Sequence, residues 1–104
     1  MEWYQKLYLG ENARKNPELI LKIKKGKPVL SAYLLILKEE GGGLLDIVHN
    51  IAFFHSLYRN MEPGMLILGV GIGKQDAMRL ARDIIEEVYS ATGGFDLSAY
   101  FNSN

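Results

Sequence analysis

Two nearly continuous apolar runs stand out in the hydrophobic pattern of this chain, and segments with helical periodicity lie between and beside them. Residues 29–37 and 65–70 are apolar at both odd and even positions, which is typical of strands covered on both sides of a sheet. In residues 44–58, and again from about residue 74 to 92, apolar side chains recur at helical spacing. The pattern therefore predicts two buried strands, one helix between them and one helix after them.

Two shorter helices are predicted before the first strand. In residues 1–8, apolar side chains at spacings of three and four form one helical stripe made of Trp3, Tyr4, Leu7 and Tyr8. Such a stripe packs on a core more often than it stacks on nucleic-acid bases. Asn16 and Pro17 carry the start signals of a second helix that ends near Gly26, and an earlier start near Glu11 stays open.

The predicted element order is α-α-β-α-β-α, within a single α/β domain that spans residues 1–104. A helix between two strands forms a right-handed βαβ crossover, so we expect a short parallel sheet with helices on both faces. Two strands are too few for a sheet whose faces are both apolar. Either a third strand lies in the terminal segments, or a symmetric homodimer completes the sheet, and we favour the homodimer.

The helix predicted over residues 44–58 carries two apolar side chains on its otherwise polar side. Phe53 and Leu57 lie four residues apart there, beside Asp46 and His49. Exposed apolar side chains on such a face favour a subunit contact, and cover by an aromatic terminal segment is the equal alternative. We therefore predict Phe53 and Leu57 as interface residues of the homodimer.

Composition and charge exclude several classes of protein. Twelve Lys and Arg balance twelve Asp and Glu, so no overall positive charge attracts nucleic acid or an anionic membrane. The chain has no cysteine, which excludes disulfides and thiolate chemistry. No apolar run reaches the roughly 18 residues of a membrane span, and the N-terminus lacks a signal-peptide pattern. We expect a cytoplasmic protein without a membrane partner, for which nucleic acid is a disfavoured ligand.

The glycine-rich turn after the second strand is the candidate ligand site. A strand, a tight turn and a helix start together present free backbone N–H groups, and Lys74 adds a positive charge, so a small anionic, phosphate-bearing ligand is favoured. In a parallel sheet the loop 39–43 reaches the same edge, where Asp46 flanks the concavity. The candidate ligand-binding residues are Gly69, Gly71, Gly73, Lys74 and Gln75.

This turn matches neither of two established phosphate-binding motifs. A P-loop requires glycine where Leu68 stands and Ser or Thr where Gln75 stands, and the third glycine of a dinucleotide fingerprint comes one position early at Gly73. The competing interpretation is architectural, because glycines let a strand turn sharply beneath a helix. We favour the architectural interpretation over a nucleotide site.

Catalytic and metal sites find little support in the sequence. His49 and His55 are six residues apart, so they do not share one face of a helix as a metal-binding pair does. We expect His55 to be a buried, hydrogen-bonded histidine. Asp46 and His49 could form an acid–base couple, but such pairs are common and weak on the solvent-exposed face of a helix. The sequence predicts no cofactor and no metal, and it favours a protein that is not an enzyme.

Residues 7–11, 66–73 and 86–96 resemble segments of a family of small uncharacterised bacterial proteins of similar length. The resemblance implies the limits of the domain and no activity. On the residues alone, our leading hypothesis is a self-associating domain that acts as a partner-binding or scaffold module. The alternative is a small protein that binds an anionic ligand at residues 69–75.

Overall fold

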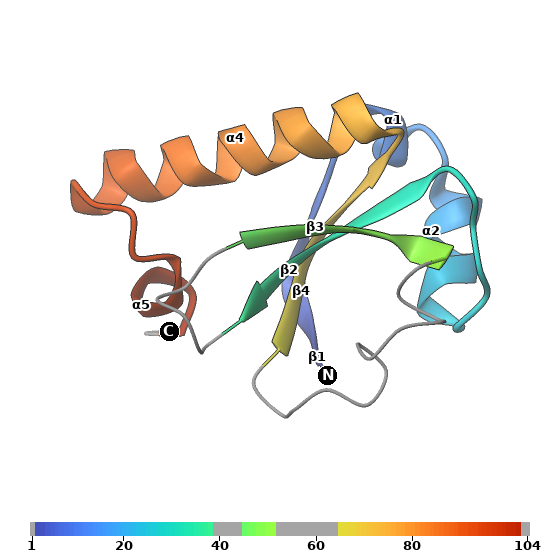
Figure 1. Ribbon diagram of the computed structural model, residues 1–104, viewed down its shortest axis with the longest axis horizontal. Helices are drawn as coiled ribbons and strands as arrows, with labels where there is room; N and C mark the ends of the chain where they lie inside the picture. Colours follow the sequence, from blue (N-terminus) through green and yellow to red (C-terminus); the bar gives the residue numbers. More distant parts are fainter. Residues whose placement is uncertain (1, 39–44, 52–64, 103–104) are drawn as a thin grey trace.

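The computed structural model describes residues 2–38, 45–51 and 65–102, and its centre is a four-stranded mixed sheet with the order β1-β4-β2-β3 (Figure 1). The strands are β1 (Glu2–Leu9), β2 (Ala32–Lys38), β3 (Leu45–His49) and β4 (Met65–Ile72). The helices are α1 (Glu11–Arg14), α2 (Pro17–Lys24), α4 (Lys74–Thr92) and α5 (Leu97–Asn102). None of the described helices combines the length and the apolar character that crossing a membrane requires.

The directions of the strands differ from the prediction. β1 runs parallel to β4, but β2 runs antiparallel to both of its neighbours, so Ala32 pairs with Ile72 and Lys38 pairs with Met65. The α/β class is confirmed, whereas the predicted parallel βαβ crossover between β2 and β4 is wrong. Apolar residues on both faces show that a strand is covered on both sides, but they carry no information about its direction.

Glu2–Leu9 form the strand β1, where a helix was predicted over residues 1–8. Trp3 and Leu7 pack on one face of the sheet, whereas Tyr4 and Tyr8 pack on the other. A spacing of four residues returns to the same face in a strand as well as in a helix, so this spacing alone does not separate the two. The alternative of a third strand in the terminal segments is therefore confirmed at β1.

A second strand also replaces part of a predicted helix. Residues 45–49 of the segment predicted as helix 44–58 form β3, in which Ile47 pairs with Leu35 of β2. Pairing with the apolar strand β2 stabilises these residues as a strand, although the spacing of their apolar side chains also fits a helix. Phe53, His55 and Leu57 lie outside the described residues. With four strands in one chain, the sheet no longer requires a second copy to complete it.

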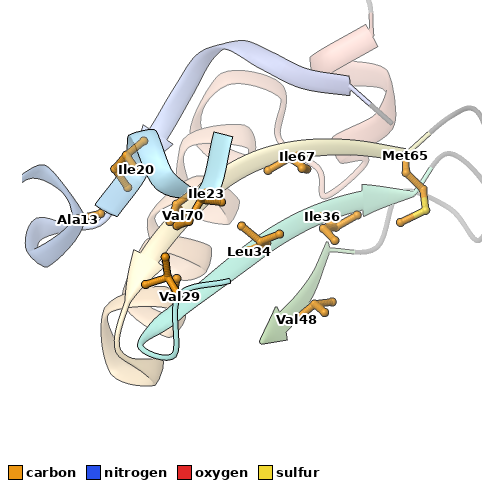
Figure 2. Packing of buried hydrophobic residues seen from close by; sticks show 11 residues of the cluster. Ala13, Ile20, Ile23, Val29, Leu34, Ile36, Val48, Met65, Ile67 and Val70 are labelled. Carbon is orange, nitrogen blue, oxygen red and sulfur yellow. The ribbon is translucent and has the colours of Figure 1, made fainter. Parts of the chain in front are cut away.

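Two hydrophobic clusters cover the two faces of the sheet, as predicted. Figure 2 shows Ala13, Ile20 and Ile23 of the first cluster packed over the sheet residues Leu34 and Val70. The second cluster contains Leu35, Leu37 and Leu68 of the sheet, packed against residues of α4 and α5. The predicted inward face of α4 is confirmed, because Ala77, Leu80, Ala81, Ile84 and Val88 are buried.

Candidate functional site

The candidate site lies at the edge of the sheet where β1 and β4 both end. Because these strands are parallel, their following helices start side by side: Gly10 precedes α1 and Gly73 precedes α4. The Gly10 N–H donates to the carbonyl of Val70 at 3.0 Å, and the Gly73 N–H donates to the carbonyl of Ser31 at 2.7 Å. The predicted glycine turn, from which α4 leaves the sheet, therefore lies beside Gly10, from which α1 leaves the sheet.

The glycines of this turn permit close packing of α4 on β4. A Cβ atom at Gly71 would lie 2.5 Å from the backbone N and Cα of Ala77. A Cβ atom at Gly69 would lie 2.9 Å from the Tyr8 carbonyl oxygen. Gly73 has a φ of 94°, a conformation that side chains disfavour. These distances support the architectural interpretation of the glycine-rich turn.

Asp76 is the central polar side chain of the site, and its exposed fraction is only 4%. One carboxylate oxygen accepts a hydrogen bond from the backbone N–H of Ile72 at 2.9 Å, and the other accepts from the N–H of Asn12 at 3.2 Å. A Cβ atom at Gly10 would overlap this carboxylate. The protein's own carboxyl group thus occupies the position at the start of α1 where an external anion would bind.

Asp76 and Gly10 were missed by the sequence analysis. Asp76 is the third residue of α4, the position from which the acidic side chain of a capping box reaches back toward the start of the helix, and this position is its signal in the sequence. In the structure its carboxylate accepts instead from the N–H of Ile72, which precedes the N-cap residue Gly73. Its second partner, Asn12, lies 64 residues away in the sequence. No local pattern indicates that contact.

The predicted ligand residues do not converge on one cavity. Gly69 and Gly71 are buried beneath α4, whereas Lys74 and Gln75 are exposed at its start. A cavity of about 110 Å³ lies between α1 and α4, and its charged lining residues are Glu11, Arg14, Asp76, Arg79 and Asp83. The cavity is therefore of mixed charge, with two cations and three acidic groups.

Asp46 and His49 lie elsewhere and do not form the predicted couple. Asp46 sits in β3 opposite Ile36, far along the sheet from the end of β4, and forms an ion pair with Lys38 at 2.8 Å. The loop 39–43 lies outside the described residues, but the premise of a shared edge is wrong, because β2 and β4 are antiparallel and Lys38 at the end of β2 pairs with Met65 at the start of β4. His49 Nε2 is 2.6 Å from the Leu30 carbonyl oxygen. Among the described residues no group of acidic and histidine side chains is placed to hold a metal.

A second polar cluster lies near the other end of α4. One carboxylate oxygen of Glu87 accepts hydrogen bonds from the hydroxyls of Tyr8 at 2.6 Å and Tyr100 at 2.9 Å. Burial, followed by the hydrogen bond to Glu87, raises the pKa of Tyr8 well above its usual range. The hydrogen bond to Glu87 also raises the pKa of Tyr100. Phe101 packs edge-on against both Tyr8 and Tyr100, so this cluster joins α5 to β1 and α4.

The outward side of α4 is a candidate contact surface. Met78 and Tyr89 are 53% and 52% exposed, and Phe95, which follows the helix, is 64% exposed. The rings of Tyr89 and Phe95 stack at 4.9 Å. Beside Met78, a hollow of about 430 Å³ is lined by Gln75, Met78, Arg79 and Arg82. We call the surface formed by residues 75, 78, 79, 82, 86 and 89 the outer stripe of α4.

Comparison of the chain with family models, with curated proteins and with solved structures found no match. The resemblance to a family of small bacterial proteins therefore stays a prediction.

Proposed function

We propose that this protein is a self-associating module that binds its partner through the outer stripe of α4. The observation that carries the proposal is the exposure of Met78 and Tyr89 on the outward side of α4, together with Phe95, which follows the helix and stacks on Tyr89. Apolar side chains gathered on one surface are typical of a protein contact, whereas single exposed ones are ordinary. The hollow beside Met78 adds a concave surface that a side chain of a partner can fill.

The proposed contact differs from the edge-to-edge sheet dimer expected from the sequence. The edge strand β1 carries a large irregularity in its pairing with β4 between Trp3 and Tyr8, and Lys6 is exposed within that irregular segment. Irregular pairing and an exposed lysine both disfavour the addition of a further strand. These features favour a helical surface over the β1 edge as the contact.

Light scattering after size-exclusion chromatography tests the proposal at protein concentrations of tens of micromolar. We expect a mass twice the 11.7 kDa of the chain. Met78→Asp should shift the protein to the monomer, because it places a charge in the apolar contact. Leu21→Asp is the matched control, since Leu21 is 58% exposed on α2, away from the outer stripe of α4. A monomeric wild-type protein at these concentrations contradicts self-association.

A second candidate function is the binding of a small anion near residues 69–75. It is favoured by Lys74 at the start of α4 and by Arg14 and Arg79 in the cavity between α1 and α4. Inorganic phosphate should then raise the melting temperature, and Lys74→Ala and Arg14→Ala should reduce that shift. Substitution of Gly71 is unsuitable as a test, since any side chain there would collide with Ala77. An unchanged melting temperature in millimolar phosphate contradicts this candidate.

A further inference from the structure

We infer that two copies of this chain pack their α4 helices antiparallel, around a two-fold axis that passes the helix at the level of Ile84. This inference rests on the proposed function and specifies the partner as a second copy. The outer stripe of α4 supplies three independent features that favour it: the distribution of charge, the spacing of side chains and the position of the hollow.

The charges on α4 are divided between its two halves. The exposed cations Lys74, Arg79 and Arg82 lie in the first half, whereas Asp83, Glu86 and Glu87 follow in the second half. This distribution opposes the helix dipole, which favours acidic side chains near the start and basic ones near the end. It does not stabilise the isolated helix, but it makes the surface complementary to a reversed copy of itself.

Glu87 already accepts hydrogen bonds from Tyr8 and Tyr100, but ion pairs within the described residues do not account for the charges of Arg79, Arg82, Asp83 and Glu86. Arg79 and Asp83, and likewise Arg82 and Glu86, are spaced four residues apart, but with the cation first, which is the weaker orientation on a helix. No ion pair involving these four side chains is present in the described part of the chain. Their charged groups are exposed and available to a partner.

An antiparallel arrangement pairs these side chains with opposite or complementary groups. With the axis at the level of Ile84, Arg82 of one copy faces Glu86 of the second copy, and symmetry produces the same ion pair twice. Arg79 then faces Tyr89 of the second copy, a pairing suited to a cation–π contact. A parallel arrangement would instead place Arg82 against Arg82 and Glu86 against Glu86.

The apolar side chains are complementary in the same register. Met78 of one copy lies next to Tyr89 of the second copy, whose ring already stacks on Phe95. Methionine sulfur packs well against aromatic rings. The hollow lined by Gln75, Met78, Arg79 and Arg82 therefore receives an aromatic side chain.

The expected dimer is weak and sensitive to salt. A helix of 19 residues is about 28 Å long, and a single pair of such helices buries less area than a standard stable interface. The ion pairs lie at the surface and are screened by added salt. We expect a dissociation constant in the micromolar range, which rises as sodium chloride is added.

Charge reversal tests the register. Arg82→Glu and Glu86→Arg should each weaken the dimer by about tenfold or more, because each substitution places like charges opposite one another. The double variant Arg82→Glu/Glu86→Arg should restore the homodimer, and an equimolar mixture of the two single variants should form a heterodimer. The matched control is Glu18→Arg together with Lys22→Glu, an exposed pair on α2, and it should leave the dimer unchanged.

Sedimentation equilibrium gives the dissociation constants, and circular dichroism verifies that each variant is folded. A wild-type dimer that both single variants leave unchanged overturns the antiparallel arrangement, while the proposed self-association stands. Weakening by the single variants without restoration in the double variant or the mixture also overturns this register. A wild-type protein that is monomeric at the tens of micromolar used in the chromatography experiment overturns both proposals.

Discussion

The two ends of α4 are each linked to the N-terminal part of the chain by a carboxyl group, but in different surroundings. Asp76, at the start of the helix, is buried and accepts hydrogen bonds from the backbone N–H groups of Ile72 and Asn12. Glu87, near the end of the helix, is exposed and accepts hydrogen bonds from the hydroxyls of Tyr8 and Tyr100. The Asp76 carboxylate is buried and both of its hydrogen bonds are partly buried, so water replaces it less readily there than it replaces Glu87 at exposed hydrogen bonds. We therefore expect the first link to contribute more to stability than the second.

Loss of the buried carboxyl group should have the largest effect. Asp76→Ala leaves the N–H groups of Ile72 and Asn12 without their acceptor, so we expect the free energy of unfolding to fall by about 3 kcal/mol. Urea denaturation followed by circular dichroism measures the change. Asp83→Ala is the control on the exposed side of the same helix and should change stability by less than about 0.5 kcal/mol. Equal losses in the two variants would contradict the contrast between the buried and exposed positions.

Gly10→Ala should have the next largest effect. The φ of Gly10 is −63°, which alanine adopts readily, so the cost arises from overlap of the new Cβ with the Asp76 carboxylate. We expect a loss of about 2 kcal/mol in the free energy of unfolding. In the double variant Gly10→Ala/Asp76→Ala the overlap disappears, so the combined loss should be smaller than the sum of the two single losses. Additive losses would show that Gly10 is required for another reason.

Substitutions in the cluster of Tyr8, Tyr100 and Glu87 should lower the free energy of unfolding by less. Tyr8→Phe removes one hydrogen bond to Glu87 but keeps the ring that packs against Tyr4 and Phe101, so we expect a loss of about 1 kcal/mol. Tyr100→Phe should have a similar or smaller effect, since its hydroxyl shares the same carboxylate oxygen. The same urea denaturation measures both changes. A loss as large as that of Asp76→Ala would reverse the ranking of the two ends of the helix.

The smallest expected effect is a dependence of stability on alkaline pH. The raised pKa of Tyr8 means that the folded protein keeps the phenol proton at pH values where the unfolded chain loses it. This contribution to stability is complete below the ordinary phenol pKa of about 10 and is lost as pH rises above it. Thermal denaturation between pH 8 and 11 should therefore show a steeper decline for the wild-type protein than for Tyr8→Phe. Identical slopes would contradict the raised pKa.

Much of the fold follows from local patterns in the sequence. α4 was predicted with its inward side chains because one helix with one buried face repeats apolar residues at a single period. The buried strands β2 and β4 were predicted from apolar runs. β1 was missed because the four-residue spacing of Tyr4 and Tyr8 fits a strand as well as a helix, and only their neighbours Trp3 and Leu7 on the opposite face show a strand.

The glycine-rich turn between β4 and α4 was predicted from the sequence, but the side chains around it are not those that were predicted. The glycines of residues 69–73 mark the turn at which α4 leaves the sheet, and the structure places that turn beside the start of α1. The predicted partners from loop 39–43 and Asp46 required parallel β2 and β4, and Asp46 lies elsewhere because these strands are antiparallel. The group that fills the site, Asp76, depends on a contact with Asn12 that no local pattern shows.

The sequence by itself determined that the runs in β2 and β4 are buried, where α4 begins and ends, and which of its side chains face inward. These properties depend on the order of side chains within a single helix or strand, and the spacing of apolar and polar residues shows that order directly. Only the tertiary structure decided the directions of the strands, the pairing of β3 with β2, and the placement of Asp76 against Gly10. These depend on contacts between segments far apart in the chain, where the free energy of packing outweighs local preference.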